Sequence, residues 1–118
     1  MSYKRGDIVI VKFPFILNAG TEHHKGRPAL VISDHKITKR YKDIILSAIT
    51  SQVPSEIMEW EIVLEPEEAN GLIKKSLLRL DFIMTIPEEL ISRKIGTLSK
   101  DILQLADQKL KVILGIQS

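Results

Sequence analysis

Apolar residues occur in short runs along this chain, and most runs have the length and composition of β-strands. The first predicted strand extends from Asp7 to Phe15 and is rich in β-branched residues. Further strands are predicted at 28–33, 43–50, 58–64, 76–86 and 94–98. Within 58–64, Trp60, Ile62 and Leu64 alternate with glutamates, which is the period of a half-buried strand.

One helix is predicted at the C-terminal end of the sequence. It begins at Lys100 after Ser99, a favourable N-cap, and it ends at Gly115. Its apolar stripe consists of Ile102, Leu103, Ala106, Leu110, Ile113 and Leu114. Several short antiparallel strands followed by one helix predict an α+β, mostly β fold: a small antiparallel barrel with a C-terminal helix, formed as a single domain by residues 1–118.

The segment between the first two predicted strands, residues 16–27, is polar and long for a hairpin connection. Loops of this length in a compact domain tend to carry function. This segment is therefore predicted to be a functional loop.

Charge is distributed unevenly, although the net charge is only +2. Residues 22–42 contain six Lys or Arg and all three histidines, against two acidic residues. Residues 56–68 contain six glutamates and no Lys or Arg. A basic face of this kind favours a polyanionic partner, and ordinary solvated loops are the alternative.

The composition excludes several classes of protein. With no cysteine there is no disulfide framework, thiolate nucleophile or Cys-based metal site. No apolar stretch approaches ~18 residues and no signal-peptide core is visible, so we expect no membrane association. A reducing cytoplasm is the expected compartment.

Arg27 stands at the head of a buried strand, between Gly26 and Pro28. Gly26 allows close approach of the backbone to a ligand, and Pro28 holds Arg27 in an extended conformation. A rigidly held guanidinium suits a phosphate or a carboxylate. A surface arginine in a loop is the alternative.

Two other strands also carry polar groups where apolar residues are expected. Thr50, Ser51 and Gln52 follow the apolar run 44–49, and Arg79 and Asp81 interrupt the run 77–83. Arginines, a carboxylate and hydroxyls are groups that can support RNA cleavage without a metal, by proton transfer and charge stabilisation at phosphorus. The spacing of Arg79 and Asp81 by itself favours a structural ion pair.

Five segments in order, 4–9, 26–32, 48–52, 80–86 and 94–98, resemble the signature blocks of the MazF/PemK/Kid toxins. The resemblance covers nearly the whole chain. It implies an SH3-like barrel, a homodimer and metal-independent, cofactor-free endoribonuclease activity on single-stranded RNA. It also implies a cognate antitoxin partner and DNA binding by the toxin–antitoxin complex.

By position, the resemblance places Arg27 and Thr50 at the scissile phosphate, with Asp81 as the base and Arg79 as the acid of the Kid/PemK branch. That branch has a histidine in the first loop where this chain has Thr21. The further RNA-binding candidates are Phe15, Glu22, His23, His24, Lys25, Ser51 and Gln52. No metal is expected, because His23, His24, Asp34 and His35 have no recognised ligand spacing.

Two alternatives remain open at this stage. Toxins of the same fold act on DNA gyrase through an aromatic residue at the end of the helix, whereas residues 111–118 contain none. The second alternative is a basic SH3-like module that binds nucleic acid without cleaving it. Phe13, Trp60 and Phe82 are predicted to be core residues, and RNA selectivity is expected in 16–25 and 53–60.

Overall fold

The computed structural model describes residues 3–12, 15–17, 21–23 and 26–117. The elements are β1 (Asp7–Val11), β2 (Phe15–Leu17), β3 (Thr21–His23), β4 (Arg27–Val31), β5 (Asp43–Thr50), β6 (Glu61–Leu64), β7 (Ser76–Pro87), the 3-10 turn η2 (Glu88–Leu90), β8 (Ile91–Thr97) and α1 (Lys100–Leu114). This is the mostly β architecture with a C-terminal helix that the sequence predicts.

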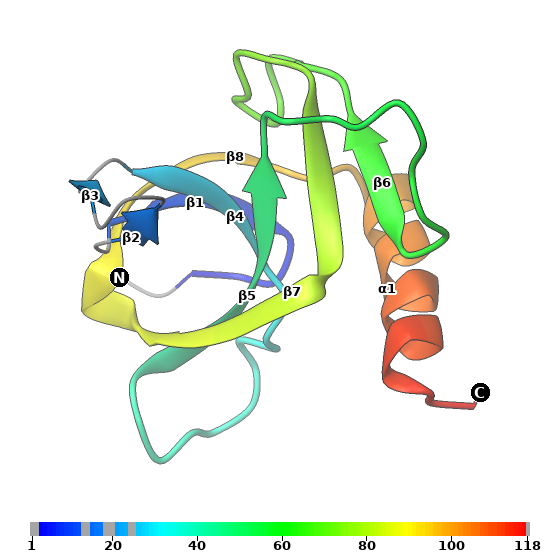
Figure 1. The fold of residues 1–118 in the computed structure, drawn as a ribbon. Coiled ribbons are helices and arrows are strands. Elements are labelled where there is room, and N and C mark those ends of the chain that lie inside the picture. The colour runs from blue at the N-terminus through cyan, green and yellow to red at the C-terminus, as the bar shows by residue number, and fades with distance from the viewer. Residues whose placement is uncertain (1–2, 13–14, 18–20, 24–25, 118) are drawn as a thin grey trace.

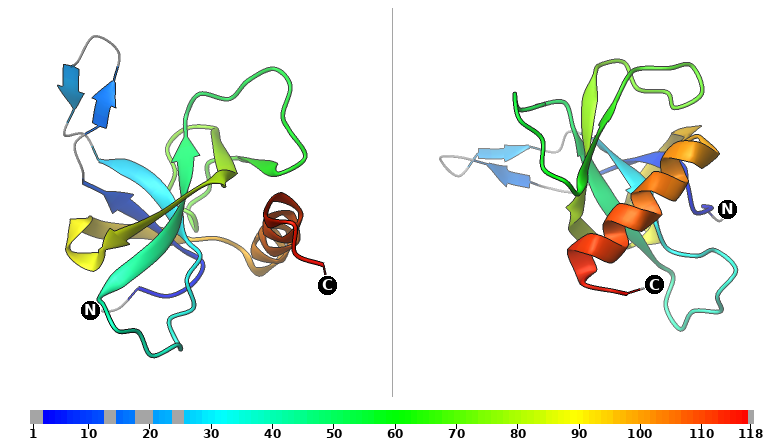
Figure 2. Two further views of the ribbon diagram at one scale, coloured as in Figure 1. Left: turned by 60° about the horizontal axis from the view of Figure 1, so that its bottom comes forward. Right: turned by 90° about the vertical axis from the view of Figure 1, so that its right-hand side faces the viewer.

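Six strands form one antiparallel sheet in the order β6-β7-β5-β4-β1-β8. The sheet curls strongly, so that β7 sweeps across the molecule beside β5 while α1 lies against one side (Figure 1). Strands β2 and β3 pair separately, in a hairpin that projects from the main body (Figure 2).

The central strands are apolar on both faces, and this produces two hydrophobic clusters. Ile8 and Val9 are adjacent on β1 and both fully buried, yet they belong to different clusters. The first cluster packs against α1 through Ile102, Leu103, Ala106 and Leu110. The second lies across the sheet and contains Val9, Val11, Ala29, Val31, Ile44, Leu46, Ile86 and Ile91.

The predicted helix is confirmed at both ends. The Ser99 hydroxyl accepts a hydrogen bond from the Ile102 amide at 3.3 Å, and Gly115 ends the helix with φ 71°. Leu114, predicted to lie on the buried stripe, is instead 55% exposed because the last turn projects past β6 (Figure 1). Within the described chain, no helix has the length and apolar character needed to span a membrane.

The structure corrects the predicted first strand and the loop after it. The strand ends at Val11 rather than Phe15, and Phe15 belongs to β2. Residues 16–27 are not wholly loop, because Ile16 pairs with Glu22 in the β2–β3 hairpin. The two strands of this ribbon pair outside the six-stranded sheet and are only three residues long, too short for an alternating sequence pattern to identify them.

Two other boundaries also move. β6 begins at Glu61 rather than Met58, because a turn precedes it: the Glu61 amide donates to the Met58 carbonyl at 3.0 Å, and the Glu61 carboxylate accepts from the Met58 amide at 2.7 Å. β8 begins at Ile91, earlier than the predicted Lys94, immediately after η2.

A large irregularity in β7 changes which side chains face the core. Ala48 of β5 pairs with Arg79, but the preceding Ser47 pairs with Ile83, so residues 80–82 of β7 have no partner on β5. Leu80 and Met84 are four residues apart, a spacing that puts both on the same face of a regular strand. Because of the irregularity they pack in different hydrophobic clusters. The prediction that Phe82 is a core residue is wrong, because it assumes unbroken alternation; Phe82 is 40% exposed.

The loop between β6 and β7 bridges the two end strands of the curled sheet, β6 and β8. The Thr97 amide of β8 donates to the Ala69 carbonyl at 2.8 Å. The buried Asn70 side chain accepts from the amides of Glu67 and Leu72, each at 3.0 Å, and donates to the Glu65 carbonyl at 2.9 Å. A Cβ atom at Gly71, which has φ +71°, would lie 2.1 Å from the Ile95 carbonyl oxygen.

We expect Asn70→Ala to lower the free energy of unfolding by about 2 to 3 kcal/mol, because it leaves the buried Leu72 amide and the partly buried Glu67 amide and Glu65 carbonyl without these partners. Urea denaturation of the variant and the wild type measures the difference. Gln104→Ala, on the exposed side of α1, is the control and is expected to change stability by less than about 0.5 kcal/mol. Equal midpoints for Asn70→Ala and the wild type would contradict the role assigned to this loop.

Candidate functional site

Arg27, Thr50 and Arg79 come from three neighbouring strands and line one pocket of about 280 Å³. The register explains their proximity. Ala29 of β4 pairs with Ala48 of β5 in antiparallel register, and the same register continued places Arg27, two residues before Ala29, beside Thr50, two residues after Ala48. The other residues around this pocket, called here the central pocket, are Val11, Pro28, Ala48, Ile49, Gln52, Phe82 and Met84.

Arg79 is held in place by two partners in the irregular part of β7. Its Nε donates to Oδ1 of Asp81 at 3.2 Å and its Nη2 donates to Oδ2 at 3.0 Å, a two-point ion pair. The guanidinium also lies 5.3 Å from the centre of the Phe82 ring. The irregularity that exposes Phe82 thus also orients Arg79.

The ion pair shifts the acidity of both groups in opposite directions. The hydrogen bond to Asp81 raises the pKa of Arg79, and the hydrogen bond from Arg79 lowers the pKa of Asp81, each against a smaller opposing effect of burial. Asp81 is therefore an ionised but weak base at neutral pH, and Arg79 remains a cation. Asp81 does not line the central pocket.

Thr50 uses only part of its hydrogen-bonding capacity within the chain. Its Oγ1 accepts from the Gln52 amide at 3.2 Å, which fixes the turn after β5. The hydroxyl proton can still be donated to a ligand. Gln52 lines the central pocket together with Thr50, and Ser51 lines the neighbouring cavity.

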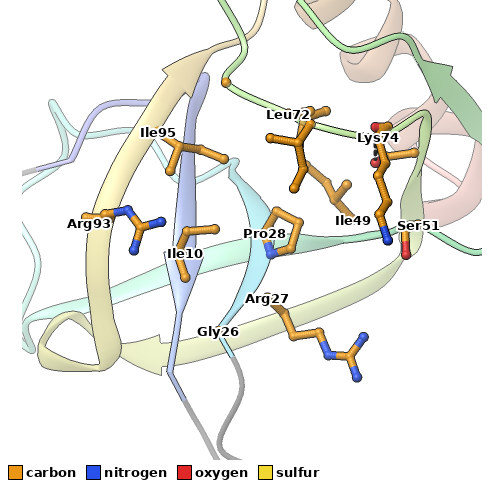
Figure 3. A pocket seen from close by; sticks show the side chains of 13 residues that line it. Ile10, Gly26, Arg27, Pro28, Ile49, Ser51, Leu72, Lys74, Arg93 and Ile95 are labelled. Carbon is orange, nitrogen blue, oxygen red and sulfur yellow. Dashed lines mark hydrogen bonds between the residues drawn. The ribbon is translucent and has the colours of Figure 1, made fainter.

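That neighbouring cavity has a volume of about 300 Å³ and is called here the lateral cavity (Figure 3). Arg27, Pro28 and Ile49 line both spaces, so the two adjoin. The lateral cavity adds Lys74 and Arg93, which the sequence analysis did not identify. One signal was present: Arg93 stands between Ile91 and Ile95 at a spacing of two, a charge in an apolar row.

Five of the RNA-binding candidates predicted from the sequence belong to the β2–β3 hairpin or to the segment that follows it. The structure describes the backbone of Phe15, Glu22 and His23 in β2 and β3. Their side chains lie outside its described part. His24 and Lys25 lie outside the described residues altogether. Within the remainder of the chain, no three His, Cys, Asp or Glu residues are grouped to hold a metal ion.

Comparison with known proteins gives a consistent result. The family described as PemK-like, MazF-like toxin of type II toxin-antitoxin system matches residues 4–114. A curated relative, the probable endoribonuclease MazF of Mycolicibacterium smegmatis, is 28% identical over 113 residues, covering 96% of this chain and 97% of the relative.

Solved structures with the same fold include the Mycobacterium tuberculosis toxin MazF-mt6, with a TM-score of 0.74, 20% identity, and coverage of 95% of this chain and 99% of that chain. A MazE–MazF structure from Deinococcus radiodurans has a TM-score of 0.74 and 19% identity, and the match covers 99% of each chain. Because the family match spans almost the whole sequence, this chain belongs to the PemK-like, MazF-like toxins of type II toxin–antitoxin systems.

Proposed function

We propose that this toxin is an endoribonuclease that cuts single-stranded RNA without a metal, with the central pocket as its active site. The observation that carries the proposal is the convergence of Arg27, Thr50 and Arg79, from three strands, on one pocket. Two permanently charged guanidiniums and a hydroxyl donor match the charge that develops on a phosphate under attack. The similarity to a relative named as a probable endoribonuclease supports the same activity.

In the proposed reaction the ribose 2′-oxygen attacks the adjacent phosphorus and the bond to the 5′-oxygen breaks. The products are a 2′,3′-cyclic phosphate and a free 5′-hydroxyl. The 2′-proton passes to water in the open pocket, and the departing 5′-oxygen takes a proton from water. Arg27, Arg79 and the Thr50 hydroxyl stabilise the non-bridging oxygens as negative charge accumulates there.

Asp81 acts in this proposal as a positioning residue. It holds the guanidinium of Arg79 through two hydrogen bonds, it does not line the pocket, and its pKa is lowered. A carboxylate in this state is poorly suited to remove a proton from a ribose hydroxyl. It is well suited to fix the direction of a cation that contacts the phosphate.

The proposed partners follow from the family. We infer a cognate antitoxin that covers the RNA site, and solved relatives include a MazE–MazF structure. We also infer a homodimer from the family. The exposed apolar side chains of Ile45, Phe82 and Ile83 on β5 and β7, at 38%, 40% and 37% exposure, are candidates for its interface. The expected place of action is the cytoplasm, where RNA is available.

We expect Arg27→Ala to lower the rate of RNA cleavage by about 10² to 10³-fold, the usual loss when one donor to a developing oxyanion is removed. Cleavage of long RNA in EDTA, with mapping of the new 5′ ends and identification of their 5′-hydroxyl groups, measures the effect. Arg40→Ala, in an exposed loop that does not line the pocket, is the matched control. Wild-type cleavage by Arg27→Ala would rule out this active site.

Asp81→Asn separates a positioning role from a role as general base. Asparagine keeps a hydrogen-bond acceptor for Arg79, so we expect a loss of about tenfold or less, whereas loss of a general base costs about 10² to 10⁴-fold. The single-turnover cleavage rate is the measurement. A loss in the larger range, with an unchanged fold by circular dichroism, would assign Asp81 as the base.

The same ion pair predicts a defined dependence of stability on pH. Because the folded-state pKa of Asp81 is lowered, its stabilising effect is present above the unfolded pKa of about 3.9 and is lost as the pH falls through the folded value. The pair is substantially exposed, so the effect is at most about 1 kcal/mol. Urea denaturation should show a constant difference between the wild type and Asp81→Asn from pH 8 to 5, disappearing towards pH 2. A difference that grows on acidification would contradict this sign.

A further inference from the structure

The lateral cavity combines an apolar floor with a charged rim. The floor consists of side chains from several elements: Ile10, Pro28, Ile49, Leu72 and Ile95. Ile49 and Leu72 are buried, at 3% and 8% exposure. In Figure 3, Arg93 reaches towards Ile10 from one side, Lys74 extends towards Ser51 on the other, and Pro28 lies between them.

The rim is cationic and contains no acidic residue to neutralise it. Arg27, Lys74 and Arg93 line the cavity, and the described lining residues include no Asp or Glu. In the described part of the chain Lys74 and Arg93 form no ion pair, whereas the adjacent Lys94 pairs with Asp7 at 3.2 Å. Two cations on opposite sides of one cavity, whose described lining holds no carboxylate, favour an anionic occupant.

The walls of the cavity are formed by tight backbone packing. A Cβ atom at Gly26 would lie 2.4 Å from Cγ2 of Ile10, and one at Gly71 would meet the backbone of Ile95. The Asn70 side chain holds the segment that leads to Leu72. The cavity is therefore built by the fold itself and does not require a ligand to assemble it.

We propose that the lateral cavity binds the nucleotide adjacent to the one that is cut, with its base or ribose against the apolar floor and its phosphate at the cationic rim that Lys74 and Arg93 belong to. This inference rests on the proposed function and extends it, because Arg27 borders both the central pocket and the lateral cavity. In this proposal an RNA strand with one phosphate at Arg27 places the next nucleotide in this space.

A nucleotide fits these features better than an acidic peptide does. The cavity volume of about 300 Å³ is at the lower end of the roughly 300–1,000 Å³ typical of small-molecule sites. Its occupant must offer an apolar, compact face and a strong anion at once. A nucleotide has both, since a base has a flat π-face and the phosphate carries the charge, whereas a carboxylate side chain has no comparable apolar surface.

The test measures binding of a randomised ten-nucleotide 2′-O-methyl RNA, which is not cut by 2′-oxygen attack, by fluorescence anisotropy. Lys74→Ala and Arg93→Ala should each raise Kd about 5- to 10-fold at 0.1 M salt and lower the slope of log Kd against log salt by about 0.7. Lys75→Ala and Arg40→Ala, exposed cations outside the cavity, are the matched controls and should stay within about twofold of the wild type.

A second readout reports on the apolar floor. Methyl resonances of Ile10, Leu72 and Ile95 should shift on addition of adenosine or uridine 3′-monophosphate, and should not shift with inorganic phosphate. Shifts with inorganic phosphate alone would overturn the placement of the base or ribose.

The outcomes separate this inference from the proposed function. If the protein cuts RNA and Lys74→Ala and Arg93→Ala bind like the controls, the lateral cavity is not an RNA subsite although the central pocket is active. If the two variants lose binding and the wild type cuts no RNA, the subsite stands and the endonuclease proposal fails. Lys74-dependent binding of poly-glutamate in place of RNA would overturn the assignment to a nucleotide.

Discussion

The structure depends on one constraint: the loop between β6 and β7 must also contact β8, the strand at the opposite end of the curled sheet. Asn70 supplies the hydrogen bonds that shape this loop, and the Ala69 carbonyl ties it to Thr97 of β8. Gly71 and Gly96 allow the two backbones to approach, because a Cβ atom at either position would collide with the opposite segment. The same loop supplies a wall of the lateral cavity, so the contacts that bridge the two end strands also build that cavity.

The central pocket arises from register rather than from any local motif. Small residues, Ala29 and Ala48, pair at the centre of β4 and β5, and this places Arg27 and Thr50 opposite each other. The irregular stretch of β7 then introduces three residues that have no partner on β5, residues 80–82. Beyond this stretch the side chains of β7 alternate between the two faces of the sheet in the opposite order. Within it, Asp81 forms a hydrogen bond with Arg79, and the Phe82 ring contacts the Arg79 guanidinium. An irregularity beside a functional site is a common way to redirect a side chain.

The charges of the site are arranged for binding and stabilising an anion. The raised pKa of Arg79 keeps it cationic, and the lowered pKa of Asp81 keeps its carboxylate ionised and engaged. Arg93 and Lys74 extend the cationic surface beyond Arg27. This distribution favours catalysis through charge stabilisation, in which precise placement of cations contributes more than proton transfer.

The sequence by itself determined the strand-rich fold, the helix with its caps at Ser99 and Gly115, and the candidates Arg27, Thr50 and Arg79, because alternation, capping and misplaced charges are local signals. Tertiary structure alone decided the exposure of Phe82, since alternation fails where β7 loses its register with β5. Tertiary structure also placed Lys74 and Arg93 in the lining of one cavity, although in the sequence both read as ordinary surface cations. Their shared cavity depends on contacts between strands and loops distant along the chain, and short-range patterns carry no information about such contacts.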